Sequence, residues 1–210
     1  LLKGVRKIQA AHFTFAAILE DGSVVTWGDA NEGGRSSAVR DQLKGVRQIQ
    51  ATPGAFAAIL EDGSVATWGP ARCGGNSSAV RDQLKGVLEI QASYAAFAAL
   101  LEDGSVVTWG HSGSGGDSSA VRDQLTGVRQ IQATSHAFAA ILEDRSVVTW
   151  GNKNFGGDSS AVQDQLKGVL QIQATSQAFA ALLEDGSVVT WGDECAGGDS
   201  SAVRDQLRGV

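Results

Sequence analysis

The side chains in this sequence that could carry out chemistry are few, and none stands in a catalytic pattern. His12, His111 and His136 could ligate a metal ion, but they are far apart in the sequence, and we expect them to share a face rather than a point. The pair Glu20-Asp21 could act in acid–base catalysis, but the same pair occurs five times beside a turn residue, whereas a catalytic pair is usually unique. No nucleophile has a base at a recognisable spacing, and no phosphate-binding glycine loop leads into a helix and a lysine. We therefore expect a protein that is not an enzyme and that needs no metal or cofactor.

Composition limits the cellular compartments and the classes of binding partner that we expect. The formal net charge of −6 disfavours nucleic acid and anionic membranes as partners, because binding to either begins with a positive surface. No segment approaches the ~18 to 20 consecutive apolar residues of a membrane span. The two cysteines, Cys73 and Cys195, are too few for a disulfide framework, and we expect both to be free thiols in loops. These observations favour a protein of the cytoplasm.

The elements that must position these side chains are five copies of one unit. The stretch from Phe15 to Gly28 returns four times with few changes, and its tryptophan recurs every 41 residues without insertion or deletion. A period of this length is typical of solenoids and propellers, in which one repeat cannot bury its own apolar face and several together can. The repeats run over 5–45, 46–86, 87–127, 128–168 and 169–209.

Each copy reads as three strands and an ambiguous segment. In the first copy, residues 5–10 alternate apolar and polar side chains, and residues 15–19 and 24–27 flank Asp21-Gly22, which predicts a hairpin with a type I′ turn. One copy has Arg145 in place of the glycine, so we expect a strained turn there. Residues 36–45 suit either a fourth, outer strand or a short capped helix, and we favour the outer strand or an extended segment with a helical turn.

The order Gln-Ala, a short loop, Phe-Ala-Ala-Ile-Leu, Glu-Asp-Gly-Ser-Val and Thr-Trp-Gly resembles the repeat of the RCC1-like β-propeller family in all five copies. The resemblance implies antiparallel blades around an axis. The unit is shorter than the family's usual repeat, and the family usually closes with seven blades rather than five. The fold we expect is an all-β, five-bladed propeller, a toroid that takes up residues 1–210 as one domain and is a monomer if the ring closes at five. The tryptophans and the recurrent phenylalanines are expected in the core between blades.

Two windows of each copy vary while the other columns are nearly constant. The first window lies between the first two strands, and the second follows Trp-Gly. Because successive strands of a blade run in opposite directions, both windows are expected on one face, which we call the variable face. The first windows are 12–13, 53–54, 94–95, 135–136 and 176–177, and the second windows are 29–32, 70–73, 111–114, 152–155 and 193–196. Loops on a rigid scaffold are where recognition usually occurs, although free drift of permissive loops or deliberate engineering would give the same pattern.

We therefore expect a scaffold whose variable face binds a protein ligand, with a saccharide as the second ligand class. The single aromatic residues Phe13, Tyr94 and Phe155 are the expected anchors. The alternatives are an RCC1-type regulatory module, associated with nucleotide exchange or a ubiquitin ligase, and a purely architectural or engineered repeat. The candidate ligand-binding residues are His12, Phe13, Asp29, Asn31, Glu32, Arg72, Tyr94, His111, His136, Asn152, Lys153, Phe155, Gln177, Asp193 and Glu194.

Overall fold

The computed structural model describes residues 3–207 as a row of five three-stranded antiparallel sheets, which we call blades 1 to 5. Residues 208 and 209, which we assigned to the end of the fifth repeat, lie outside the described residues. In each blade the strands follow sequence order from one edge to the other, so every connection is a local hairpin. The strands are β1 (Val5–Ala10), β2 (Thr14–Leu19), β3 (Val24–Gly28), β4 (Val46–Ala51), β5 (Phe56–Leu60), β6 (Val65–Trp68), β7 (Val87–Ala92), β8 (Ala96–Leu101), β9 (Val106–Gly110), β10 (Val128–Ala133), β11 (Ala137–Leu142), β12 (Val147–Gly151), β13 (Val169–Ala174), β14 (Ala178–Leu183) and β15 (Val188–Gly192).

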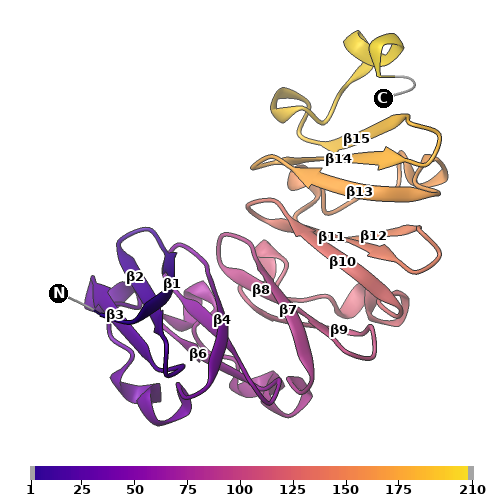
Figure 1. The fold of residues 1–210 in the computed structure, drawn as a ribbon. Coiled ribbons are helices and arrows are strands. Elements are labelled where there is room, and N and C mark those ends of the chain that lie inside the picture. Colours follow the sequence, from indigo (N-terminus) through magenta and orange to yellow (C-terminus); the bar gives the residue numbers. More distant parts are fainter. Residues whose placement is uncertain (1–2, 208–210) are drawn as a thin grey trace.

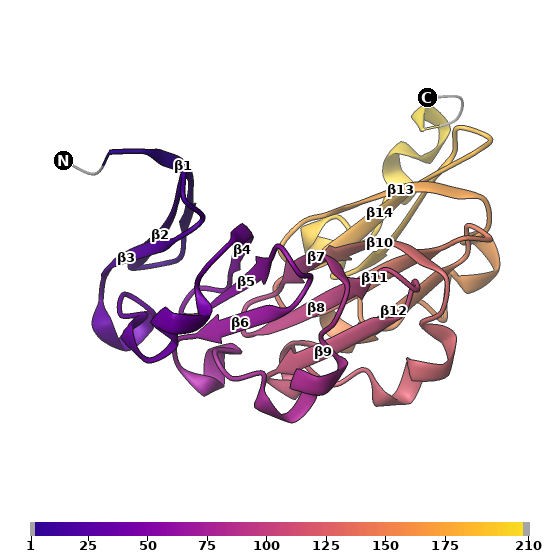
Figure 2. The same ribbon diagram turned by 60° about the horizontal axis from the view of Figure 1, so that its bottom comes forward.

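The five blades follow one another around an arc (Figure 1). The first strands of neighbouring blades, such as β1 and β4, contact one another, and turning the molecule shows the same succession of blades from a second side (Figure 2). The predicted fold class, an all-β propeller of five blades, is confirmed. Blade 1 and blade 5 lie at opposite ends of the arc, and the ring is open between them in this structure (Figure 1).

The hydrophobic core lies between blades rather than within them. Ala16 and Ile18 of blade 1, for example, pack with Ile49, Phe56 and Trp68 of blade 2. Phe56 and Trp68 face each other across β5 and β6, and their rings stack with centroids 5.1 Å apart. The same aromatic pair is buried in blades 3, 4 and 5. The core position predicted for the tryptophans and phenylalanines is therefore confirmed in blades 2 to 5.

Blade 1 differs from the other blades. The prediction that its phenylalanine and tryptophan lie in the core is wrong. Phe15 is 42% exposed and Trp27 is 37% exposed, although their rings still stack on each other. The residues have the same types as in the other blades, but no described blade packs against this side of blade 1. Burial of the pair thus depends on the position of the blade in the row and not on the local sequence.

Within residues 3–207 no blade has a fourth strand, so the outer strand, one of the two forms that we favoured for residues 36–45 and their copies, is wrong, whereas the helical turn is found. A 3₁₀ turn follows each third strand, and most blades then carry a longer 3₁₀ segment in place of the outer strand. Val121 N donates to Ser118 O over 3.0 Å, which is the three-residue spacing of such a helix. The 3₁₀ elements are η1 (Ala30–Glu32), η2 (Ser37–Gln42), η3 (Ala71–Cys73), η4 (Ser78–Gln83), η5 (Ser112–Ser114), η6 (Ser119–Gln124), η7 (Lys153–Phe155), η8 (Gln163–Gln165), η9 (Glu194–Ala196) and η10 (Ser201–Gln206).

The predicted type I′ hairpin turn is also wrong, although the hairpin itself is confirmed. Of the turn residues only the glycine has a positive φ, 75° at Gly22, whereas a type I′ turn needs two such residues. The amide of Gly22 donates to Leu19 O, and the Asp21 carboxylate accepts hydrogen bonds from both the amide and the hydroxyl of Ser23. In blade 4, Arg145 adopts the same conformation with φ 64°, which agrees with the strain expected there.

Candidate functional site

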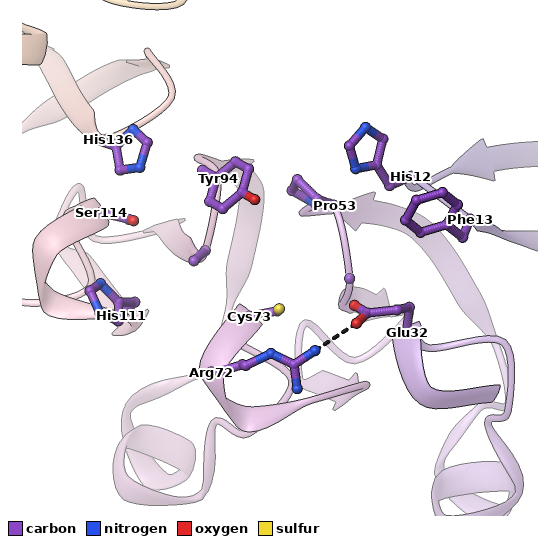
Figure 3. A pocket seen from close by; sticks show the side chains of 12 residues that line it. His12, Phe13, Glu32, Pro53, Arg72, Cys73, Tyr94, His111, Ser114 and His136 are labelled. Carbon is purple, nitrogen blue, oxygen red and sulfur yellow. Dashed lines mark hydrogen bonds and ion pairs between the residues drawn. The ribbon is translucent and has the colours of Figure 1, made fainter. Parts of the chain in front are cut away.

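The variable face carries a pocket of about 500 Å³ that is formed by both windows of blades 1 to 3 and by the first window of blade 4. First-window residues such as Phe13 and Tyr94 and second-window residues such as Glu32 and Arg72 surround it (Figure 3). The two windows therefore lie on one face, as strand alternation predicts. The lining residues are His12, Phe13, Glu32, Pro53, Gly54, Arg72, Cys73, Tyr94, Ala95, His111, Ser114 and His136.

A hydroxyl group fastens the two windows of each blade to each other. In blades 2 to 5 the residue before the first window donates from its hydroxyl to the carbonyl of the last second-window residue. The bonds are Thr52 to Cys73 O (2.8 Å), Ser93 to Ser114 O (2.7 Å), Thr134 to Phe155 O (2.9 Å) and Thr175 to Ala196 O (3.0 Å). Blade 1 has Ala11 at this position, and Thr14, three residues later, makes the equivalent bond to Glu32 O over 3.0 Å. The acceptor is always main chain, so the side chains of the window are free to differ.

Three of the candidate residues cap the short 3₁₀ turn in their own second window. Asp29 Oδ1 accepts from the amide of Asn31 (2.8 Å), Asn152 Oδ1 from the amide of Asn154 (3.0 Å), and Asp193 Oδ1 from the amide of Ala196 (3.0 Å). An Asp or Asn side chain is the usual cap for such amides. The structure thus gives Asp29, Asn152 and Asp193 a local structural role, and none of them lines the pocket.

An ion pair joins blades 1 and 2 at one side of the pocket. Arg72 Nη2 lies 2.6 Å from Glu32 Oε1, and the dashed line in Figure 3 marks this contact. The Glu32 side chain reaches Arg72 by lying over Gly54, where an added Cβ would come within 2.2 Å of Glu32 Oε2. Gly54 therefore leaves room for the pair.

Aromatic and imidazole rings form the rest of the pocket wall. Tyr94 stacks on His136 with ring centroids 5.4 Å apart, and His136 also contacts Phe155 with centroids 4.4 Å apart. Tyr94 is 53% exposed and Phe13 67% exposed, so both are available as anchors. Phe155 is half-buried behind His136 and packs against the core between blades 4 and 5, so it supports the wall rather than standing free.

His136 is a polar side chain in a perturbed environment. Its Nδ1 is buried and has no hydrogen-bond partner within the described part of the chain. Burial lowers the pKa of His136, and the nearby His111 lowers it further. His136 is therefore neutral at pH 7. Burial also raises the pKa of the Cys73 thiol, which keeps it protonated.

All three histidines line this one pocket, with His12 on the other side of it from His111 and His136 (Figure 3), so they share a face rather than a point, as expected. Within residues 3–207, no three His, Cys, Asp or Glu side chains are grouped so that they could hold a metal ion. The two cysteines are free thiols in the 3₁₀ turns η3 and η9, as predicted.

The other candidate residues do not reach the pocket. Asn31 is exposed on η1, and Gln177 is half-buried in blade 5. Lys153 and Glu194 line a separate hollow of about 450 Å³ between blades 4 and 5, where Lys153 Nζ lies 3.7 Å from Asp158 Oδ2. The pocket is thus confined to blades 1 to 4 and does not follow the fivefold repeat.

Five lining residues were missed because candidates were chosen by side-chain chemistry: Pro53, Gly54, Cys73, Ala95 and Ser114. All five lie in the variable windows, and their small size is what hollows the surface between the larger rings. Among the described residues, no helix is long and apolar enough to cross a membrane.

No protein-family model and no curated protein matches the sequence. Among solved structures, Prp20p from Saccharomyces cerevisiae superposes with a TM-score of 0.60 at 21% identity, covering 90% of this chain and 57% of that one. The complex of yeast RCC1 (Prp20) with Kap60 gives a TM-score of 0.59 at 20% identity, with 90% and 56% covered. The CRINKLY ectodomain of the Arabidopsis thaliana receptor kinase ACR4 gives 0.58 at 18% identity, with 91% and 65% covered. The chain spans less than two thirds of each of these structures. Its fold is that of the RCC1-like β-propellers.

Proposed function

We propose that the protein is a non-enzymatic binding module, one domain of five repeats, which takes up a protein ligand at the variable face. The observation that carries the proposal is the pocket that windows of four consecutive blades form together. Its volume of about 500 Å³ suits one or two inserted side chains of a ligand, and ligand sites are usually apolar pockets with a few polar groups.

Tyr94 and Phe13 are the proposed anchors. Both are exposed aromatic side chains on opposite sides of the pocket, and aromatic residues dominate the energetics of protein interfaces (Figure 3). The Glu32–Arg72 pair is the proposed polar contact, since it offers a charge pair beside the apolar wall. Because closely packed blades hold the loops, little loop entropy is lost on binding.

A protein ligand fits this surface better than a saccharide. A multivalent lectin would be expected to repeat one pocket in every blade, whereas here the windows differ and the pocket does not recur. Yeast Prp20 is bound to Kap60 in one of the similar structures, and the other is described with its binding to Gsp1p and histones. Those partners belong to the yeast protein, and they support the class of ligand rather than its identity.

The test is selection of peptides from a random library displayed on phage, followed by titration of the enriched peptides. Tyr94→Ala and Phe13→Ala should each weaken binding at least tenfold, which is about 1.4 kcal/mol. Leu88→Ala is the matched control, because Leu88 is a large apolar residue, 47% exposed, that does not line the pocket.

Failure to enrich any peptide, or enriched peptides that bind the two pocket variants as well as the control, would refute the proposal. A glycan array probed with the same proteins separates the second ligand class. If a saccharide binds and the Tyr94→Ala variant loses that binding, the ligand of the pocket is a saccharide and not a protein.

A further inference from the structure

The junction between neighbouring blades repeats four times in this chain, with the same atoms each time. The indole Nε1 of the later blade donates to the carbonyl of the first glycine of the Gly-Gly pair in the earlier blade. The four bonds are Trp68 to Gly33 O (3.1 Å), Trp109 to Gly74 O (3.0 Å), Trp150 to Gly115 O (3.0 Å) and Trp191 to Gly156 O (3.0 Å). Each junction thus has a tryptophan half and a glycine half.

The glycine half is shaped to receive a phenylalanine. A Cβ added to Gly33 would lie 3.0 Å from the ring of Phe56, and one added to Gly115 would lie 2.6 Å from the ring of Phe138. No side chain larger than hydrogen fits at such distances. The ring of the later blade therefore packs directly on the backbone of the earlier blade.

Blade 1 carries a tryptophan half that no described blade covers. Ile8, Phe15 and Trp27 are 55%, 42% and 37% exposed, whereas their counterparts in the other blades are at most 5% exposed. Within residues 3–207, the indole of Trp27 makes no bond of the kind the other four tryptophans make. Three adjoining apolar side chains of this size are a feature of interaction surfaces.

Blade 5 carries the matching glycine half. Gly197 is exposed and has the same left-handed conformation as Gly156, with φ 99° against 86°. A Cβ added to Gly197 would meet nothing within 4 Å, in contrast to the phenylalanine contacts at the other four junctions. The open halves stand at opposite ends of the arc, so one molecule does not join its own two halves (Figure 1).

We propose that copies of this chain associate head to tail, with the glycine half of blade 5 of one copy docked on Ile8, Phe15 and Trp27 of blade 1 of the next. A second copy is the expected partner because its blade 5 carries an open glycine half, which is the surface that covers the tryptophan half at the four internal junctions. The contact joins two different surfaces, so each addition leaves one open half at each end and gives a series of oligomers rather than a single dimer. Since the junction geometry repeats, the variable faces of joined copies point the same way.

The fluorescence of Trp27 reports this contact, because the other four tryptophans are only 4 to 5% exposed. Acrylamide should quench Trp27 in dilute protein, and this quenching should disappear as the concentration rises. Sedimentation velocity should show the mass increasing over the same range.

Gly197→Asn blocks the glycine half without touching blade 1. Asparagine tolerates the left-handed conformation, and the site is open, so the fold should be kept and the urea midpoint should stay unchanged. Self-association should weaken at least tenfold. Leu170→Ser, which removes an apolar residue that is 49% exposed elsewhere, is the control and should associate as the wild type does.

Mixing two variants decides the orientation. Gly197→Asn keeps an intact tryptophan half, and Trp27→Ser keeps an intact glycine half, so neither should associate alone and the mixture should form a one-to-one complex that protects Trp27 of the first. Association of Gly197→Asn alone would mean that blade 1 faces pack on each other and would overturn the proposal. No concentration dependence in the wild type, or no complex in the mixture, would overturn it as well.

Discussion

The two ends of the blades show why one set of loops is constant and the other is not. We call the end that carries the Glu-Asp-Gly-Ser turns the constant face. There, the structure of the turn restricts which side chains can be present. A Cβ on Gly63 would lie 2.9 Å from Gly86 Cα, and the Asp62 carboxylate accepts hydrogen bonds from the amide and the hydroxyl of Ser64. On the variable face every blade has a hydrogen bond from a hydroxyl just outside the window to a main-chain carbonyl, as between Thr52 and Cys73 O, and three blades add a capping side chain inside the window. A loop held through its backbone can change its side chains without changing its shape.

This difference predicts that the same substitution lowers stability much more on the constant face than on the variable face. Gly104→Ala should destabilise the protein by about 3 kcal/mol, because its φ is +77° and the new Cβ would lie 3.0 Å from Gly127 Cα. Gly113→Ala in a variable window should change stability by less than ~0.5 kcal/mol, because its Cβ would meet only the mobile end of the His111 side chain. Urea denaturation measures both. Equal losses would contradict the comparison.

The hydroxyl group that fastens the windows of blade 1 should work from either of two sequence positions, residue 14 or residue 11. Thr14→Ala should cost roughly 1.5 kcal/mol, because it leaves Glu32 O without its donor. Adding Ala11→Thr puts a hydroxyl where blades 2 to 5 have one and should restore at least half of the lost stability. Urea midpoints of the single and double variants decide this, and a double variant no better than the single one would show that the bond does not fasten the windows.

The two faces should also lose stability in different pH ranges. Hydrogen bonds from serine lower the pKa of the turn aspartates on the constant face, so their contribution is complete above about pH 4 and is lost as the pH falls through the lowered values. The pKa of His136 on the variable face is lowered from 6.5, so its contribution is lost as the pH falls below 6.5. Urea midpoints between pH 7.5 and pH 3 should show two steps. His136→Gln should remove only the upper step, and loss of the lower step instead would contradict these assignments.

The smallest effect is expected where the constant face breaks its own pattern. Arg145→Gly removes a side chain from the left-handed conformation, which should stabilise the protein by about 1 kcal/mol. Two effects oppose this gain: an exposed ion pair with Glu184 is lost, and glycine raises the conformational entropy of the unfolded chain. A net gain on the order of 0.5 kcal/mol is expected from these opposing terms. A clear loss of stability in thermal or urea unfolding would mean that the ion pair outweighs the strain.

The sequence predicted what repeats, because repetition is visible without a structure. The three strands of each blade, the buried Phe56–Trp68 type of pair and the shared face of the two windows all follow from periodicity and strand direction. The hydroxyl that fastens the windows also left a signal, since Thr52 and its copies are all serine or threonine except Ala11, where Thr14 replaces it.

Properties that depend on neighbours could not be predicted in this way. Phe15 and Trp27 have the same local sequence as their buried copies and are exposed only because of where blade 1 lies. The pocket arises where small residues such as Gly54 and Ala95 stand between large ones in adjoining blades. The segment after the third strand became a 3₁₀ helix because its amides bond three residues back, as from Leu125 to Arg122 O, and not to the edge of the sheet.

The central claim is that the variable face binds the ligand and that the other parts of the blades keep the loops of this face in place. The most direct measurement is titration of an enriched peptide with a variant in which all ten windows carry the residues of blade 5, none of which lines the pocket. The account predicts a variant that still folds, with a urea midpoint lowered mainly by the loss of Phe155 from its contact with the core between blades 4 and 5, together with loss of peptide binding. Retained binding, or a variant that no longer folds, would contradict it.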